Sequence, residues 1–123
     1  MFNLIIMIEI DCMPLSGRGK PIHATIHEGE FCNIKWGKTS FSFPYSFLNE
    51  ILKNYFVDRK WYPLGGNFTP PWKGLGEYII KNQKYFSPSP KYASAIASIM
   101  FQLDLIDFRE VSTPRYSIEL RKR

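Results

Sequence analysis

The sequence has little cysteine and little histidine, with two residues of each among 123. Cys12 and Cys32 are too few for the disulfide framework of a small secreted domain, and they lack the CxxC spacing of a zinc site. The apolar run at residues 2–10 contains Glu9 and is far shorter than the roughly 20 residues of a membrane span. We therefore expect a cytoplasmic protein with reduced thiols, no metal, no cofactor and no membrane association.

Acidic residues are also in the minority. Eleven Asp and Glu stand against 16 Lys and Arg, which gives a formal net charge of +5. Basic residues gather near the C-terminal end of the sequence, at Arg121, Lys122 and Arg123. This balance favours a polyanionic partner such as nucleic acid, while a solvated basic tail that only aids solubility is the alternative.

Apolar residues are plentiful, because 45% of the chain is hydrophobic and 16% is aromatic. That supply is enough to offset the entropy lost when the backbone is ordered, so the chain should fold without metal or disulfide support. We predict an α+β protein with an N-terminal antiparallel β-sheet and one helix in residues 1–60. This part should pack on a second module in residues 61–123, so that the two form one compact body.

The N-terminal half reads as a small sheet followed by a helix. Residues 4–10 are rich in isoleucine without polar alternation, which predicts a central strand covered on both faces. Residues 14–20 are a basic loop with turn chemistry, and alternating stretches near 22–27, 31–36 and 39–43 predict an antiparallel meander. Ser46 is a suitable N-cap for a helix that runs to about Val57.

The C-terminal half changes from helical to strand periodicity. A short helix is expected at residues 75–82, and a second begins at Pro90 with Tyr92, Ile96 and Leu103 on its core face. After residue 105 the period changes to two, which predicts a β-hairpin with its turn at residues 112–115.

The order of short helix, turn, longer helix and hairpin over about residues 75–120 resembles the winged helix-turn-helix family. The segment KYASAIASIMFQLDLIDFREVSTPRYSIEL is similar to that family's recognition helix and wing, and the helix from residue 47 to residue 57 is the candidate first helix. The resemblance implies a protein that binds double-stranded DNA, such as a transcription regulator or a viral or mobile-element protein. In that family the second helix of the motif lies in the major groove.

The resemblance also implies which residues contact nucleic acid. Positions that would face the bases are Lys91, Ser94, Ala95, Ser98 and Gln102. Basic residues that would contact phosphate from the wing and the C-terminal end are Arg109, Arg115, Arg121, Lys122 and Arg123. The helix face is small and nearly neutral, unlike the Arg-rich or Asn-rich face of a strong sequence reader, so we expect phosphate contacts to dominate.

Other functions remain open from the sequence. The Ser and Ala face would also suit a protein-interaction or dimerisation module, with a protein partner or a second copy of the chain packed closely on it. We expect a binding protein without catalytic residues rather than an enzyme. A small metal-dependent nuclease is the enzymatic alternative, and its ingredients are Glu9, Asp11, Glu28, Glu30 and Lys35.

Metal binding by the histidines is a further alternative. His23 and His27 fall on one side of a strand, where a cysteine could join them. They fit no zinc spacing, and outward polar positions on a half-exposed sheet explain both.

Overall fold

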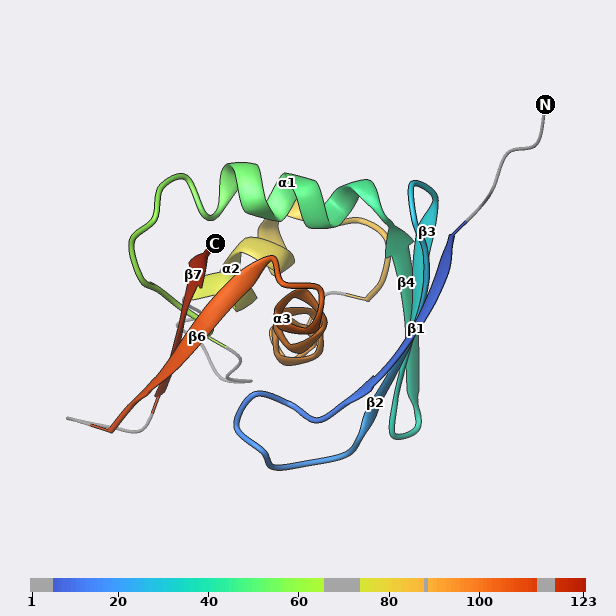
Figure 1. The fold of residues 1–123 in the computed structure, drawn as a ribbon, viewed down its shortest axis with the longest axis horizontal. Helices are drawn as coiled ribbons and strands as arrows, with labels where there is room; N and C mark the ends of the chain where they lie inside the picture. The colour runs from blue at the N-terminus through green and yellow to red at the C-terminus, as the bar shows by residue number, and fades with distance from the viewer. Residues whose placement is uncertain (1–5, 66–73, 88, 113–116) are drawn as a thin grey trace.

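The computed structural model describes residues 6–65, 74–87, 89–112 and 117–123. Within these ranges the chain forms a four-stranded antiparallel sheet, a three-stranded sheet and three helices, which agrees with the predicted mixture of α and β structure. Figure 1 shows helix α3 between the two sheets, with α1 lying across one end of both. The layers are therefore sheet, helix and sheet.

The four-stranded sheet is a meander in the order β1-β2-β3-β4, as the alternating pattern predicts. Ile22, Ala24 and Ile26 of β2 point inward and are fully buried, while the residues between them are half-buried on the other face. This period of two is the expected pattern for a sheet with one solvated face. The strands are β1 (Met7–Cys12), β2 (Ile22–His27), β3 (Phe31–Trp36) and β4 (Thr39–Pro44).

The first strand differs from its prediction. β1 pairs only with β2 and forms an edge of the sheet, and its residues alternate between exposed and half-buried. The expectation of a central strand covered on both faces is therefore wrong. Its isoleucines, Ile8 and Ile10, pack on one face only, while Glu9 and Asp11 occupy the solvated face.

Helix α1 (Ser46–Asn54) buries Phe47, Leu48 and Ile51, as its spacing predicts. Its N-cap is Tyr45 rather than Ser46, and no side chain caps it. The helix also ends three residues before the predicted Val57, because Tyr55 already acts as its C-cap.

The described part of the C-terminal half contains a short strand and two helices, followed by a hairpin. The hairpin lies where the sequence predicts it. β6 pairs with β7, and the short β5 adds to the other edge of β7 to give the order β5-β7-β6. The turn predicted at residues 112–115 falls mostly outside the described residues. The elements are β5 (Tyr62–Pro63), α2 (Gly74–Asn82), α3 (Tyr92–Gln102), β6 (Ile106–Val111) and β7 (Ser117–Lys122).

A close backbone approach joins α2 to the segment after β5. The N–H of Gly76 donates a hydrogen bond to the carbonyl of Leu64 at 3.0 Å. A Cβ at Gly76 would lie 1.9 Å from the carbonyl oxygen of Gly65, so only glycine fits there.

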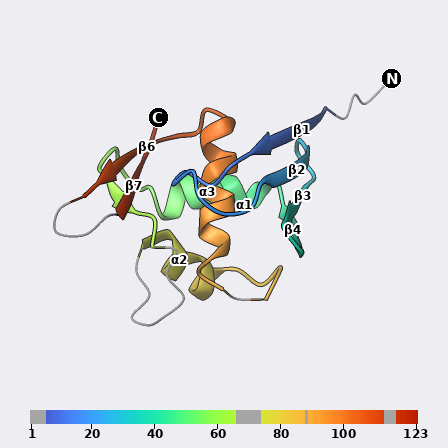
Figure 2. The ribbon, with the colours of Figure 1, turned by 90° about the horizontal axis from the view of Figure 1, so that it is seen from below.

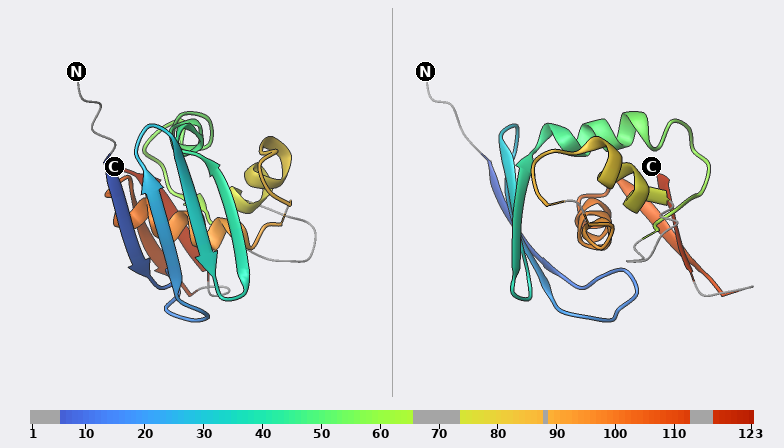
Figure 3. Two further views of the ribbon diagram at one scale, coloured as in Figure 1. Left: turned by 90° about the vertical axis from the view of Figure 1, so that its right-hand side faces the viewer. Right: turned by 180° about the vertical axis from the view of Figure 1, so that it is seen from behind.

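Helix α3 is buried on nearly all sides. It contacts α2, β1 and β6, and Figure 3 shows the four strands of the N-terminal sheet lying alongside it. Figure 2 shows the loop between β1 and β2 crossing the helix. The buried residues of α3 are Ala93, Ala95, Ile96, Ala97, Ser98, Ile99 and Met100.

An aromatic cluster connects the N-terminal sheet to the start of α3. The Phe41 ring of β4 stacks on Tyr92 with centroids 4.4 Å apart, and Phe86 lies 5.0 Å from Phe41 and 5.1 Å from Tyr92. Such contacts add to the free energy gained by burying the rings. One core cluster of buried residues accordingly includes side chains from both halves of the chain.

Candidate nucleic-acid interface

A basic pocket of about 430 Å³ lies where the N-terminal sheet meets the first turn of α3. Three segments far apart in the sequence form it: the end of the β1–β2 loop, the turn between β3 and β4, and the start of α3. In Figure 1 the β1–β2 loop and the β3–β4 turn both lie on the lower side of the molecule. The residues that line the basic pocket are Gly19, Lys20, Trp36, Gly37, Lys38, Thr39, Lys91 and Ser94.

The loop is fixed to the sheet at this point. The indole Nε1 of Trp36 donates a hydrogen bond to the backbone carbonyl of Lys20 at 3.0 Å. Gly37 has a φ of +60°, which the tight turn between β3 and β4 requires. A Cβ at Gly37 would lie only 3.2 Å from Cγ of Lys20, so glycine also lets the lysine stem pack over the turn. Both contacts hold Lys20 at the rim of the basic pocket.

The charge of the basic pocket is of one sign. Lys20, Lys38 and Lys91 line it, and none of its lining residues that the structure describes is acidic. Thr39 and Ser94 add two hydroxyl groups. Three ammonium groups around one concave site raise its local positive potential, which favours an anionic ligand.

The first turn of α3 contributes side chains rather than free backbone donors. The N–H groups of Tyr92, Ala93 and Ser94 donate to the carbonyls of Ser89, Pro90 and Lys91, at 3.0–3.3 Å. Any anion in the basic pocket would therefore be held by the lysines and hydroxyls, with only a general contribution from the helix dipole.

The predicted base-facing residues of α3 separate into two groups. Lys91 and Ser94 line the basic pocket, and Gln102 is exposed at the other end of the helix. Ala95 and Ser98 are 0% and 1% exposed, so the expectation that they face a partner is wrong. The Oγ of Ser98 donates to the backbone carbonyl of Met13 at 2.5 Å, because the β1–β2 loop packs on this small face.

This packing also bears on the protein-interaction alternative. The Ser and Ala face of α3 does permit close approach, but the element that approaches is the start of the β1–β2 loop of the same chain. Ala95 and Ser98 are therefore covered within the chain, while Ser94 remains partly exposed and Gln102 exposed.

The arginines of the hairpin surround one indole ring. The guanidinium carbons of Arg109 and Arg121 each lie 4.4 Å from the ring centroid of Trp61, which precedes β5. Arg109 also forms an ion pair with Glu119, with its Nη2 2.7 Å from Oε1. Arg115 lies outside the described residues.

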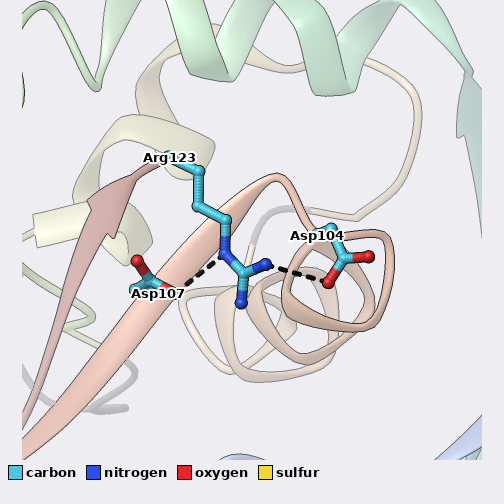
Figure 4. A network of polar contacts seen from close by, with 3 residues as sticks. All are labelled: Asp104, Asp107 and Arg123. Carbon is cyan, nitrogen blue, oxygen red and sulfur yellow. Dashed lines mark hydrogen bonds and ion pairs between the residues drawn. The ribbon is translucent and has the colours of Figure 1, made fainter.

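The last two predicted residues are close to acidic groups. Figure 4 shows Arg123 between two carboxylates, with Nη1 3.0 Å from Asp104 and Nε 2.8 Å from Asp107. Lys122 is half-buried, and its charge contributes to lowering the pKa of Asp58. The main cause of that lowered pKa is the hydrogen bond from the backbone N–H of Lys60, followed by the bond from the Tyr62 hydroxyl. Arg109 and Arg123 are therefore partly neutralised locally by neighbouring carboxylates, which weakens their attraction for a phosphate.

The histidines and the acidic residues of the sheet do not assemble into a metal site. His23 Nδ1 lies 2.6 Å from Asp11 Oδ1, and Nε2 lies 3.9 Å from Glu9. His27 packs against Phe31 with ring centroids 4.3 Å apart. Within the described ranges, no group of three or more His, Cys, Asp or Glu residues is placed to hold a metal ion. The nuclease alternative has no metal cluster to support it there.

Sequence reasoning recognised the basic loop and the strands on either side of residues 37–38 but missed the pocket that the loop and the turn between these strands form. Trp36, Lys38 and Thr39 were not among the predicted contacts. The available signal was a tryptophan directly before a Gly-Lys turn, and nothing in it indicated that the start of α3 would lie opposite.

Comparisons of the chain with models of known protein families, with curated proteins and with solved structures gave no match. Among the residues that the structure describes, no helix is long and apolar enough to cross a membrane.

Proposed function

We propose that this protein binds nucleic acid and that a phosphate of the nucleic-acid backbone enters the basic pocket. The observation that carries this proposal is the convergence of Lys20, Lys38 and Lys91 from three separate segments on one concave site whose described lining residues include no acidic side chain. A solvated basic face would not require the lysines to surround a pocket. The formal net charge of +5 adds a general attraction toward polyanions.

Phosphate contacts by lysine imply a characteristic salt dependence. Each neutralised phosphate releases condensed counterions, so log K falls linearly with log salt by about 0.9 per contact on a duplex and about 0.7 on a single strand. The lysines offer point charges without the planar fork of arginine, so they position a phosphate without reading a base. Binding should therefore be strongly salt-dependent and weakly sequence-dependent.

The winged-helix arrangement is a second part of the proposal. Its support is the order of α1, α2 and α3 followed by the β6–β7 hairpin, which β5 extends to three strands. In this arrangement α3 does not enter a major groove, because Ser98 and its neighbours are covered by the β1–β2 loop. The helix contributes Lys91 and Ser94 at its first turn instead.

The hairpin supplies a secondary contact in this proposal. Arg121 lies on Trp61, and Arg109 and Arg123 are paired with carboxylates, so their net attraction for phosphate is weaker than that of the basic pocket. We place this binding activity in the cytosol, a reducing compartment where free thiols such as Cys12 and Cys32 persist.

The test is a titration of fluorescein-labelled DNA and RNA, single-stranded and duplex, followed by fluorescence anisotropy at several salt concentrations. The variant replaces Lys20, Lys38 and Lys91 by alanine. We expect its affinity to fall at least about tenfold, and the magnitude of its salt slope to fall by about 2–3 on duplex DNA.

The matched control removes the same charge elsewhere. Lys53, Lys81 and Lys84 lie on α1, on α2 and after α2, away from the basic pocket. Their triple alanine variant should keep most of the affinity, apart from a general effect of net charge. Equal losses in the two variants would show that charge alone matters, and no binding by the wild-type chain at low salt would remove the proposal.

A further inference from the structure

We infer that the basic pocket receives one unpaired nucleotide, whose phosphate meets the lysines while its base stacks on Trp36, so that the preferred ligand is a single strand. This inference rests on the proposed function and specifies its substrate class. It depends on the shape of the basic pocket, the position of the indole and the kinds of polar group around it.

The indole of Trp36 is placed for stacking. It lines the basic pocket and is half-buried, and its Nε1–H is already bonded to the carbonyl of Lys20. That bond fixes the ring orientation. Trp36 makes no ring-to-ring contact with another aromatic residue in the described part of the chain, whereas Phe41, Tyr92 and Phe86 nearby are packed against one another. No aromatic ring in that part of the chain therefore competes with a base for the indole, and base–aromatic stacking tolerates any base.

The concave shape favours an unpaired nucleotide over a duplex. A volume of about 430 Å³ is in the range of pockets that enclose a small organic ligand. The phosphates of a duplex lie on a convex surface, and its bases are stacked and paired, so a base could reach Trp36 only after flipping out at a cost of a few kcal/mol. A single strand presents base and phosphate together without that cost.

The residues that line the basic pocket also predict that it does not discriminate between different bases. Among the described residues that line it there is no Asn, Gln or Arg side chain, which are the groups that form bidentate hydrogen bonds with base edges. Its neutral polar side chains are the hydroxyls of Thr39 and Ser94, which suit a sugar or a base edge equally. Single strands of different base composition should therefore bind with similar affinity.

The experiment compares three forms of Trp36 on two ligands. Trp36→Phe keeps an aromatic face without the N–H donor, and Trp36→Leu keeps apolar bulk without a face for stacking. A labelled 15-nucleotide oligothymidine and a 15-base-pair duplex are titrated by anisotropy at one salt concentration, and circular dichroism melts confirm that each variant is folded. We expect oligothymidine affinity to fall about tenfold or more for Trp36→Leu and less than about threefold for Trp36→Phe. Duplex affinity should change little in both.

A second readout follows the indole itself. Oligothymidine should quench tryptophan fluorescence in the wild-type chain, and this quenching should be largely lost in Trp36→Phe although the variant still binds, since only Trp61 and Trp72 remain. Equal or tighter binding of the duplex, with no effect of either variant, would overturn this inference and leave the phosphate-binding proposal intact. Loss of both proposals requires that the wild-type chain bind neither ligand.

Discussion

The packing of the β1–β2 loop on α3 can be tested by a covalent link. The Oγ of Ser98 lies 3.3 Å from the Sγ of Cys12, a native cysteine 86 residues away in the sequence. A sulfur atom in place of that oxygen needs to move only about 1.3 Å to reach the disulfide bond length of about 2.05 Å. We therefore expect Ser98→Cys to form a disulfide with Cys12 on mild oxidation.

The size of the effect follows from the loop that the disulfide closes. Constraining an unfolded loop of this length removes entropy equivalent to about 4–5 kcal/mol at 25 °C, less any strain in the native state. For a chain of this size 1 kcal/mol corresponds to about 4 °C in Tm, so the oxidised form should melt up to about 16–20 °C above its reduced form. Mass spectrometry under non-reducing conditions identifies the link, and melts with and without reductant measure the shift.

The disulfide also discriminates between two ways of binding nucleic acid. If the basic pocket is the interface, the oxidised protein should bind as well as the reduced protein, because the link lies under the loop and not in the basic pocket. If α3 must be uncovered to enter a major groove, oxidation should abolish binding. Failure of the disulfide to form in a folded Ser98→Cys chain would refute the packing of the loop on the helix, and with it the reason for rejecting α3 as a reading helix.

Two further predictions concern the core. Burial raises the pKa of the Cys32 thiol to about 12 from its ordinary value of 9.0, so at pH 8 Cys32 should react with a thiol reagent only when the chain unfolds. The free energy of unfolding should also fall as the pH rises from about 9 toward 12, because the thiol of the unfolded chain loses its proton before that of the folded chain. Rapid labelling of Cys32 in the native protein, located by peptide mapping, would contradict its burial. Phe41→Ala removes the ring that stacks on Tyr92 and should lower the free energy of unfolding, measured by urea titration, by about 3–5 kcal/mol. The control is Ser40→Ala at the exposed neighbouring position, which should lower it by less than about 0.5 kcal/mol. Equal effects of the two substitutions would exclude the aromatic cluster as a link between sheet and helix.

Local periodicity was sufficient to predict most of the elements. The alternation of Ile22, Ala24 and Ile26 indicated a strand with one buried face, and the change of period after residue 105 indicated the hairpin. These patterns record which face of each element meets the core, and that information is local. Boundaries such as the start of α1 were less certain because Tyr45 caps the helix through its backbone conformation alone.

What covers an element is not local, and the sequence did not reveal it. The isoleucine-rich pattern of β1 predicts burial on both faces, although Glu9 and Asp11 mark the solvated face of an edge strand. In α3 the opposite error occurred. Serine and alanine at positions 98 and 95 are compatible with either solvent or close packing, and the packing partner, Met13, is 85 residues away.

The same nonlocality explains why the candidate site could be predicted only in part. The sequence indicates Lys91 and Ser94 as contacts on the helix and the segment containing Lys20 as a basic loop, but it does not indicate that the two lie on one surface. The structure joins them because the loop that covers Ser98 continues toward Lys20, which Trp36 then fixes beside the first turn of α3. The contact that covers Ser98 of α3 thus lies in the same loop that brings Lys20 to the basic pocket. Neither half of the chain contains the candidate site alone, since Lys20 and Lys38 come from the loop and turn of the sheet and Lys91 from the start of the helix, so the proposed binding would depend on the packing between them.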